Sequence, residues 1–232
     1  MSATPAGTLT LYDRTYNLAA LDATEMTYFN NAFSTILGTH DSVERQILMD
    51  RQSMVLAAVQ AVKAAVYPAN PNFRGLEPGD MELGMAEIRP VHTKIGNGSP
   101  QPIWDFTISP ATWTDWLVAT GGGVGYTLDK RFGQLILYTK SFDTPVPLAS
   151  ELWFKIGRTQ LMPMDIRNIQ LLDNVNNAPV FPLPSMLVLP SVDQLYAQMW
   201  SDYGGVSRLG IGGLTIGLGA FLKSQPSLTW MT

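Results

Sequence analysis

The sequence predicts a mainly β fold: a jelly-roll barrel or sandwich of about eight strands, with an N-terminal helical segment and a short helix before the last strand. Two observations support this class. Short apolar segments recur between residues 81 and 222, separated by Pro, Gly and Asn. Helical periodicity is concentrated before residue 70. The chain therefore divides into residues 1–70, an arm and helices that pack on the barrel or on a neighbour, and residues 71–232, the β-barrel domain.

The N-terminal region begins with a loosely alternating segment at residues 8–18, which suits a short strand or an extended arm. Asp22 and Glu25 then have the spacing of a capping box, and this predicts a short helix over residues 26–37. Gly38 follows that segment and ends the predicted helix.

Residues 41–66 give the clearest helix prediction. Asp41 or Ser42 supplies the N-cap, apolar residues recur every three to four positions, and the helix is expected to stop before Pro68. Its second half is nearly all Ala and Val. We therefore expect that half to be buried, against a sheet or against another copy of the chain.

The β domain contains one strong turn signal, Asn97-Gly98, because both central residues of a type I′ turn need positive φ. Residues 112–120 fit a strand or a short helix, and residues 125–128 are expected to pair with residues 134–140. The spacing of Leu195, Tyr196 and Met199 predicts a helix over residues 191–203. The remaining predicted strands are residues 81–91, 103–108, 151–156, 164–172, 180–189 and 208–222.

The last predicted strand is unusually rich in glycine. The pair Gly212-Gly213 predicts a β-bulge that resets the strand register. The small residues would let another backbone approach closely. One interpretation is a central strand bent around a corner, and the other is a seam for a neighbouring subunit or a lipid surface.

Composition limits the function. Charged residues make up only 15% of the 232 residues, so much of the surface is expected to face partners. The net charge is −4 and basic residues do not cluster, which argues against nucleic-acid binding. Cysteine is absent, which excludes disulfides, thiolate metal sites and cysteine nucleophiles.

No motif predicts catalysis, a cofactor or a metal. His40 and His92 have no partner at ligand spacing, and each is interpreted as a water-contacting residue at a helix entry or in a strand. The glycines at 121–125 lack the strand, helix and acidic residue of a nucleotide fingerprint. An acidic turn formed by Glu77, Asp80, Glu82 and Glu87 lacks the dense oxygen ligands of a calcium loop.

Aromatic and apolar residues remain as the candidates for contacts. Trp104, Trp113, Trp116 and Trp153 fit either a ligand-stacking face or core and interface anchors. The predicted interface residues are Val55, Val59, Val62, Val66, Trp113, Trp116, Leu209, Ile211, Leu214, Ile216 and Leu218.

In its low charge, N-terminal arm, apolar helix and strands over residues 81–222, the chain resembles the single-jelly-roll major capsid proteins of icosahedral double-stranded DNA viruses with an internal membrane, of the sphaerolipovirus type. The resemblance implies upright barrels that pair into pseudo-hexameric capsomers with identical or related subunits, above a membrane or membrane protein. It also implies a virion protein made in the host cytoplasm. Two features depart from the family: haloarchaeal members are more acidic, and the helix over residues 41–66 has no counterpart in a minimal jelly roll.

The sequence therefore predicts a non-enzymatic capsid subunit that assembles into an icosahedral shell through β-barrel packing and does not contact nucleic acid directly. The alternative is a carbohydrate- or receptor-binding β-sandwich on a virion or cell surface. A shell subunit hides its apolar surface only on assembly, whereas a binding module displays an aromatic platform as a monomer.

Overall fold

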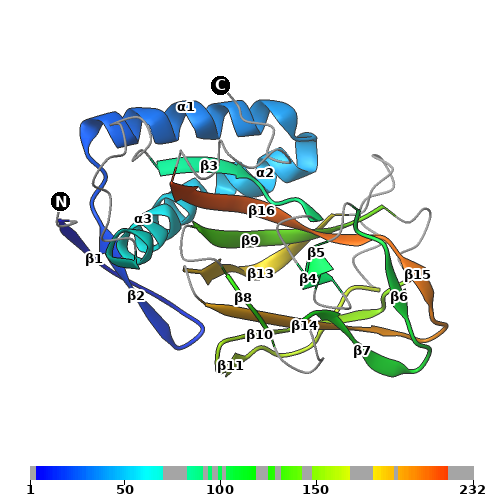
Figure 1. Cartoon of the computed structure of the whole chain (residues 1–232). Coiled ribbons are helices and arrows are strands. Elements are labelled where there is room, and N and C mark those ends of the chain that lie inside the picture. Colours follow the sequence, from blue (N-terminus) through cyan, green and yellow to red (C-terminus); the bar gives the residue numbers. More distant parts are fainter. Residues whose placement is uncertain are drawn as a thin grey trace.

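The computed structural model describes residues 4–69, 83–90, 94–95, 99–100, 103–118, 125–128, 132–142, 148–167, 180–190 and 193–218. This part of the chain is mainly β, with antiparallel sheets and three helices near the N-terminus (Figure 1). The helices are α1 (Ala23–Thr39), α2 (Ser42–Asp50) and α3 (Gln52–Ala69). The strands are β1 (Pro5–Leu11), β2 (Arg14–Ala19), β3 (Leu83–Glu87), β4 (Lys94–Ile95), β5 (Ser99–Pro100), β6 (Phe106–Ile108), β7 (Thr112–Leu117), β8 (Tyr126–Thr127), β9 (Phe132–Ser141), β10 (Glu151–Ile156), β11 (Thr159–Gln160), β12 (Met164–Asp165), β13 (Val180–Leu189), β14 (Gln194–Ser201), β15 (Gly205–Ser207) and β16 (Leu209–Leu218).

Most strands belong to two sheets. A four-stranded antiparallel sheet has the order β13-β9-β16-β3. An eight-stranded sheet follows the path β11-β10-β14-β7-β4-β5, with β12 beside β10 and β8 beside β14. Buried side chains of both sheets meet in one core, among them Ile136 and Ile211 from the first sheet and Phe154 and Leu195 from the second. In the described part of the chain no strand pairing joins the two sheets, so they form a sandwich and not a closed barrel.

The three helices cover the other face of the four-stranded sheet (Figure 1). A second core lies there, in which Phe33 of α1 and Val59 of α3 pack with Leu137 of β9 and Leu214 of β16. The four-stranded sheet is thus buried on both faces. This explains why β9 reads as a nearly continuous buried run instead of an alternating one.

The predicted N-terminal arm is a β-hairpin. Tyr12 and Asp13 form its turn with φ values of 50° and 60°, as a two-residue hairpin turn requires. The hairpin is fixed to β13, the edge strand of the four-stranded sheet. Tyr12 Oη donates to the Ser185 carbonyl at 2.9 Å and Tyr16 Oη donates to the Val188 carbonyl at 3.0 Å.

The two helix predictions before residue 70 are confirmed in type but not in bounds. The capping box of Asp22 and Glu25 is present at the start of α1. The single helix predicted over residues 41–66 is wrong: α2 and α3 are separate helices that meet at Arg51, whose φ of −109° and ψ of 12° are not helical. Helix α3 also continues through Pro68, because a proline in the last turn removes one hydrogen bond without ending the helix before it.

The helix predicted over residues 191–203 is wrong. Strand β14 occupies this segment, paired with β10 on one side and with β7 on the other. Leu195, Ala197 and Met199 face the inter-sheet core at alternate positions. The same residues fit a strand period and a helix period, and pairing with two neighbouring strands decides between them.

Two further strand predictions have clear outcomes. The pairing of residues 125–128 with 134–140 is wrong, because β8 pairs with β14 and β9 pairs with β13 and β16. Residues 112–120, left open between helix and strand, contain β7. The turn residues Asn97-Gly98 lie outside the described residues, but β4 and β5 on either side pair as an antiparallel hairpin.

Candidate functional site

A pocket of about 250 Å³ lies where the α1–α2 junction meets β3, β9 and β16. Its floor is the glycine-rich part of β16, and we call it the glycine pocket. The side chains used below are His40, Glu44, Glu87, Trp104, Tyr138 and Lys140. They come from four separate segments of the chain, so no local sequence motif could predict that they lie together.

The floor of the glycine pocket exists because three positions of β16 lack a side chain. A Cβ at Gly210 would lie 2.8 Å from Nε1 of Trp104, and a Cβ at Gly212 would lie 1.9 Å from Cε2 of Tyr138. The two aromatic rings therefore lie directly on the strand. The predicted bulge at Gly212-Gly213 is confirmed, since the β9–β16 register shifts there and Gly213 has a φ of 153°.

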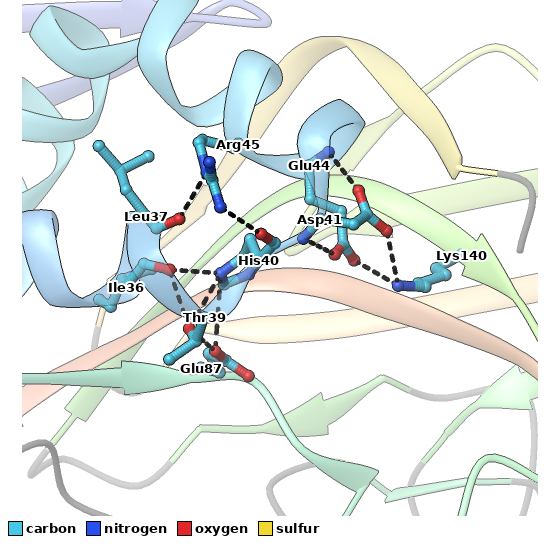
Figure 2. Close-up of polar contacts among 9 residues, drawn as sticks. All are labelled: Ile36, Leu37, Thr39, His40, Asp41, Glu44, Arg45, Glu87 and Lys140. Carbon is cyan, nitrogen blue, oxygen red and sulfur yellow. Dashed lines mark hydrogen bonds and ion pairs between the residues drawn. The ribbon is translucent and has the colours of Figure 1, made fainter. Parts of the chain in front are cut away.

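The α1–α2 junction supplies the charged wall of the pocket (Figure 2). Asp41 caps α2 by accepting hydrogen bonds from the backbone N–H groups of Val43 and Glu44, both at 3.0 Å. Lys140 Nζ of β9 lies 3.2 Å from Asp41 Oδ2 and 3.0 Å from Glu44 Oε1. The lysine thus joins the helix cap to the sheet.

This ion-pair network shifts the pKa values of Lys140 and Asp41. Burial alone would lower the pKa of Lys140, but hydrogen bonds and charges from Glu44 and Asp41 raise it above its usual value. Burial would raise the pKa of Asp41, and the hydrogen bonds from the Glu44 N–H and from Lys140 outweigh it and lower that pKa. Asp41 and Lys140 are therefore held in their charged forms at neutral pH.

His40 and Glu87 form the second polar wall (Figure 2). His40 Nδ1 donates to the Ile36 carbonyl at 2.7 Å and lies 3.6 Å from Glu87 Oε1. Thr39 Oγ1 donates to the same Glu87 oxygen at 2.9 Å. His40 lies at the entry to α2, as the sequence predicted, and 7% of its side chain is exposed. Packing of α1 against β3 encloses the ring.

Tyr138 lies between these walls and the floor. Burial raises the pKa of its phenol well above the usual value, and the Glu44 carboxylate adds to the effect through a hydrogen bond and its charge. The phenol is therefore neutral over the whole physiological range.

An apolar groove of about 420 Å³ adjoins the glycine pocket and shares Trp104 and Phe142 with it. Ile103 is 55% exposed and Phe142 is 47% exposed, which is unusual for side chains of this size. One ion pair, between Arg208 Nε and Asp105 Oδ1 at 3.0 Å, borders the groove. This groove offers apolar surface that the described residues leave uncovered.

Four aromatic side chains lie on the outer face of β7, β10 and β14, which we call the aromatic face. Trp153 contacts Tyr196 edge-on with ring centroids 5.5 Å apart, and Trp113 contacts Trp200 at 5.9 Å. Asp115 Oδ1 lies between the pairs and accepts from Tyr196 Oη at 2.6 Å and from Gln198 Nε2 at 2.8 Å. Burial, followed by this hydrogen bond and charge, raises the pKa of Tyr196.

The predicted interface residues are almost all core residues of one chain. Val55, Val59 and Val62 are at most 1% exposed in the helix–sheet core, and Trp116 is fully buried between the sheets. Leu209, Ile211, Leu214 and Ile216 are at most 3% exposed. Their side chains cannot contact another subunit, because neighbouring elements of the same chain already surround them. Trp113 is half-buried on the aromatic face, and the side chains of Val66 and Leu218 lie outside the described residues.

The remaining residues that the sequence singled out lie partly at the pocket or on the aromatic face and partly outside the described residues. Trp104 borders the glycine pocket, and Trp153 lies on the aromatic face. His92, the glycines at 121–124, and Glu77, Asp80 and Glu82 lie outside the described residues. Within the described residues, no group of three His, Cys, Asp or Glu side chains is placed to hold a metal ion. None of the described helices is both long enough and apolar enough to cross a membrane.

Together, fold and site define an antiparallel β-sandwich with a helical layer on one sheet and a small polar pocket beneath that layer. Comparisons with protein-family models, with curated proteins and with solved structures find no match to this chain.

Proposed function

We propose that the chain is a structural subunit of a closed shell, a capsid protein that assembles through its β-sandwich with copies of itself or with related subunits. The proposal includes a jelly-roll topology for the sandwich and a virion location for the protein. It assigns no catalysis to the chain. The strand order carries the proposal, and the exposed apolar groove adds to it.

The strand order supports a jelly roll. In that fold eight strands, counted along the chain, form two sheets with the orders 1-8-3-6 and 2-7-4-5. We number the strands in chain order as β3 (1), β7 (2), β9 (3), β10 (4), β11–β12 (5), β13 (6), β14 (7) and β16 (8). The four-stranded sheet then has the order 6-3-8-1. The first four positions in the path of the eight-stranded sheet have the order 5-4-7-2. The agreement of these two orders with the jelly-roll orders is what supports the proposal.

The surface supports assembly more than catalysis. The apolar groove leaves Ile103 and Phe142 about half exposed, and large exposed apolar patches mark contacts with other molecules. The low charge content of 15% agrees with a surface that is largely covered in use. We therefore place a subunit contact at the apolar groove and not on the core residues that the sequence indicated.

Substitution of the groove tests this proposal. Ile103→Asp places a charge in the groove, and we expect it to reduce the mass of the assembled species measured by size-exclusion chromatography with light scattering. Met162→Asp is the matched control, because Met162 is 85% exposed but does not border the groove. A wild-type chain that stays monomeric at all concentrations would overturn the proposal. If both variants assembled equally well, the subunit contact would lie outside the apolar groove.

A carbohydrate-binding module is the second candidate, and the aromatic face favours it. Aromatic rings beside a hydrogen-bonding carboxylate, as at Trp153, Tyr196 and Asp115, are suited to stacking and hydrogen-bonding a sugar ring. This candidate predicts glycan binding by a monomer, which is lost in Trp153→Ala and kept in Ile103→Asp. Binding that survives Trp153→Ala would exclude the aromatic face as the glycan site.

A further inference from the structure

The glycine pocket has hydrogen-bond acceptors that no described residue satisfies. Because a carbonyl only accepts, the 2.7 Å contact with Ile36 places a proton on His40 Nδ1, and in the uncharged tautomer of that ring Nε2 is an acceptor. Glu87 uses Oε1 for Thr39 and His40, and its Oε2 has no partner in the described part of the chain. The His40 side chain is more than nine-tenths buried and borders the pocket. These acceptors suit an occupant that brings N–H or O–H donors.

The charges of the pocket favour a cation among such donors. Asp41, Glu44 and Glu87 carry three negative charges, while Lys140 carries one positive charge and is already paired with two of them. Arg45 lies behind the junction and donates to the backbone carbonyls of Leu37 and His40. Even with Arg45 counted, the cluster keeps a net negative charge, and Glu87 is its one carboxylate without a Lys or Arg side chain in contact among the described residues.

The aromatic side chains of the pocket favour a flat or compact cation. The Trp104 ring lies against Gly210, and Phe142 borders the pocket from the end of β9. Lys140 Nζ already lies 5.9 Å from the centre of the Phe142 ring, so this ring accepts a cation in the present structure. The volume of about 250 Å³ is below the roughly 300–1,000 Å³ of pockets for drug-sized ligands. It suits a group the size of a side-chain end.

From these observations we infer that the glycine pocket binds a guanidinium or ammonium group, which donates hydrogen bonds to Glu87 Oε2 and His40 Nε2 and stacks against Trp104. Two sources share this chemistry: a soluble organic cation, and an Arg or Lys side chain of a second copy of the chain. The site is independent of the aromatic face and does not need the capsid proposal to hold.

The test uses N-acetyl-L-arginine methylamide as the probe and N-acetyl-L-citrulline methylamide as its neutral isostere. Titration of the ¹⁵N-labelled chain, followed by NMR, is expected to shift the backbone amides of Gly210 and Gly212 with the arginine probe only. Glu87→Gln keeps the side-chain shape and is expected to weaken binding about tenfold. Glu151→Gln, a carboxylate change on β10 far from the pocket, is the control and leaves the affinity within a factor of about two. Trp104→Leu is expected to weaken binding as well.

Three results would overturn the inference: no shift at the glycines with the arginine probe, equal binding of the citrulline probe, or an unchanged affinity in Glu87→Gln with a wild-type melting temperature. Binding of methyl glucoside in place of the arginine probe would assign the pocket to a sugar and also contradict it. Light scattering then separates the sources. A smaller assembled mass in Glu87→Gln identifies a side chain of a second copy, and an unchanged mass identifies a soluble cation.

Discussion

Gly212→Ala is the substitution that tests the construction of the pocket floor most sharply. Gly212 does not have a positive φ, so alanine fits its backbone conformation. The obstacle is steric: the new Cβ would lie 1.9 Å from Cε2 of Tyr138, a side chain that is only 3% exposed. The ring has to move within a closely packed core.

The expected cost follows from two opposing effects. Overpacking of a filled core costs about 1–3 kcal/mol. Replacing glycine by alanine restricts the unfolded chain and returns about 0.4–1 kcal/mol. We therefore expect Gly212→Ala to lower the free energy of unfolding by about 1–2 kcal/mol. Urea denaturation followed by far-UV circular dichroism measures this change. The matched control is Gly38→Ala in α1, where a Cβ meets nothing within 4 Å and alanine should stabilise the helix by up to about 1 kcal/mol.

A double-mutant cycle identifies the clashing ring. Tyr138→Ala alone costs several kcal/mol, because it leaves a cavity in the helix–sheet core. In that background Gly212→Ala no longer meets the ring and should be neutral or slightly stabilising. The coupling energy is therefore expected to exceed about 1 kcal/mol. A coupling energy near zero would refute the steric account of the glycine floor.

Two other predictions concern the attachment of the N-terminal elements to the sheet. Arg51 donates from Nη1 to the Leu137 carbonyl at 3.2 Å and from Nη2 to the Leu183 carbonyl. Arg51→Met should therefore lower the free energy of unfolding by about 1–3 kcal/mol in urea denaturation. The control Arg158→Met, at an exposed turn, should leave it unchanged. Burial raises the pKa of Tyr16 to about 12, with Arg14 opposing and Asp193 adding to the shift. Because the folded-state pKa lies above the unfolded value near 10, this group contributes its stability below pH 10 and loses it as the pH rises toward 12. This difference of two pKa units corresponds to a contribution of about 3 kcal/mol to the free energy of unfolding. Between pH 9.5 and 11.5 the urea midpoint of Tyr16→Phe should fall less steeply than that of the wild type, and equal slopes would contradict the shift.

The strands of the second half were predictable because they carry their own signals. Residues 151–156 and 180–189 match β10 and β13 in both bounds. Each has turn residues on both sides and the apolar or alternating pattern of a buried strand. The bulge at Gly212-Gly213 was also predictable, since adjacent glycines within an apolar strand are typical of a β-bulge.

The errors arose where tertiary contacts outweigh local pattern. Leu195, Ala197 and Met199 fit two periods, and only the neighbours β7 and β10 select the strand. The helix break at Arg51 has no glycine or proline to mark it. It coincides with a side chain that reaches two carbonyl groups of the sheet, on β9 and β13.

The glycine pocket could be predicted only in part. The glycines of β16 were visible as sites of close approach, and the approaching groups are the Trp104 ring at Gly210, the Tyr138 ring at Gly212 and the Leu135 backbone at Gly213, all of the same chain. His40 and Glu87 are 47 positions apart and meet because α1 packs against β3. Neither residue carries a local signal of this contact. The apolar residues predicted for the interface on β16, Leu209, Ile211, Leu214 and Ile216, are core residues because both faces of their sheet are covered by the same chain.

Electron microscopy of the purified chain tests the central proposal most directly. Negative-stain images recorded over a range of protein concentrations and salt should show rings or closed particles of uniform size, and Ile103→Asp should abolish them while Met162→Asp should not. Dispersed monomers under every condition, with the apolar groove still open to solvent, would contradict the proposal that this sandwich builds a shell.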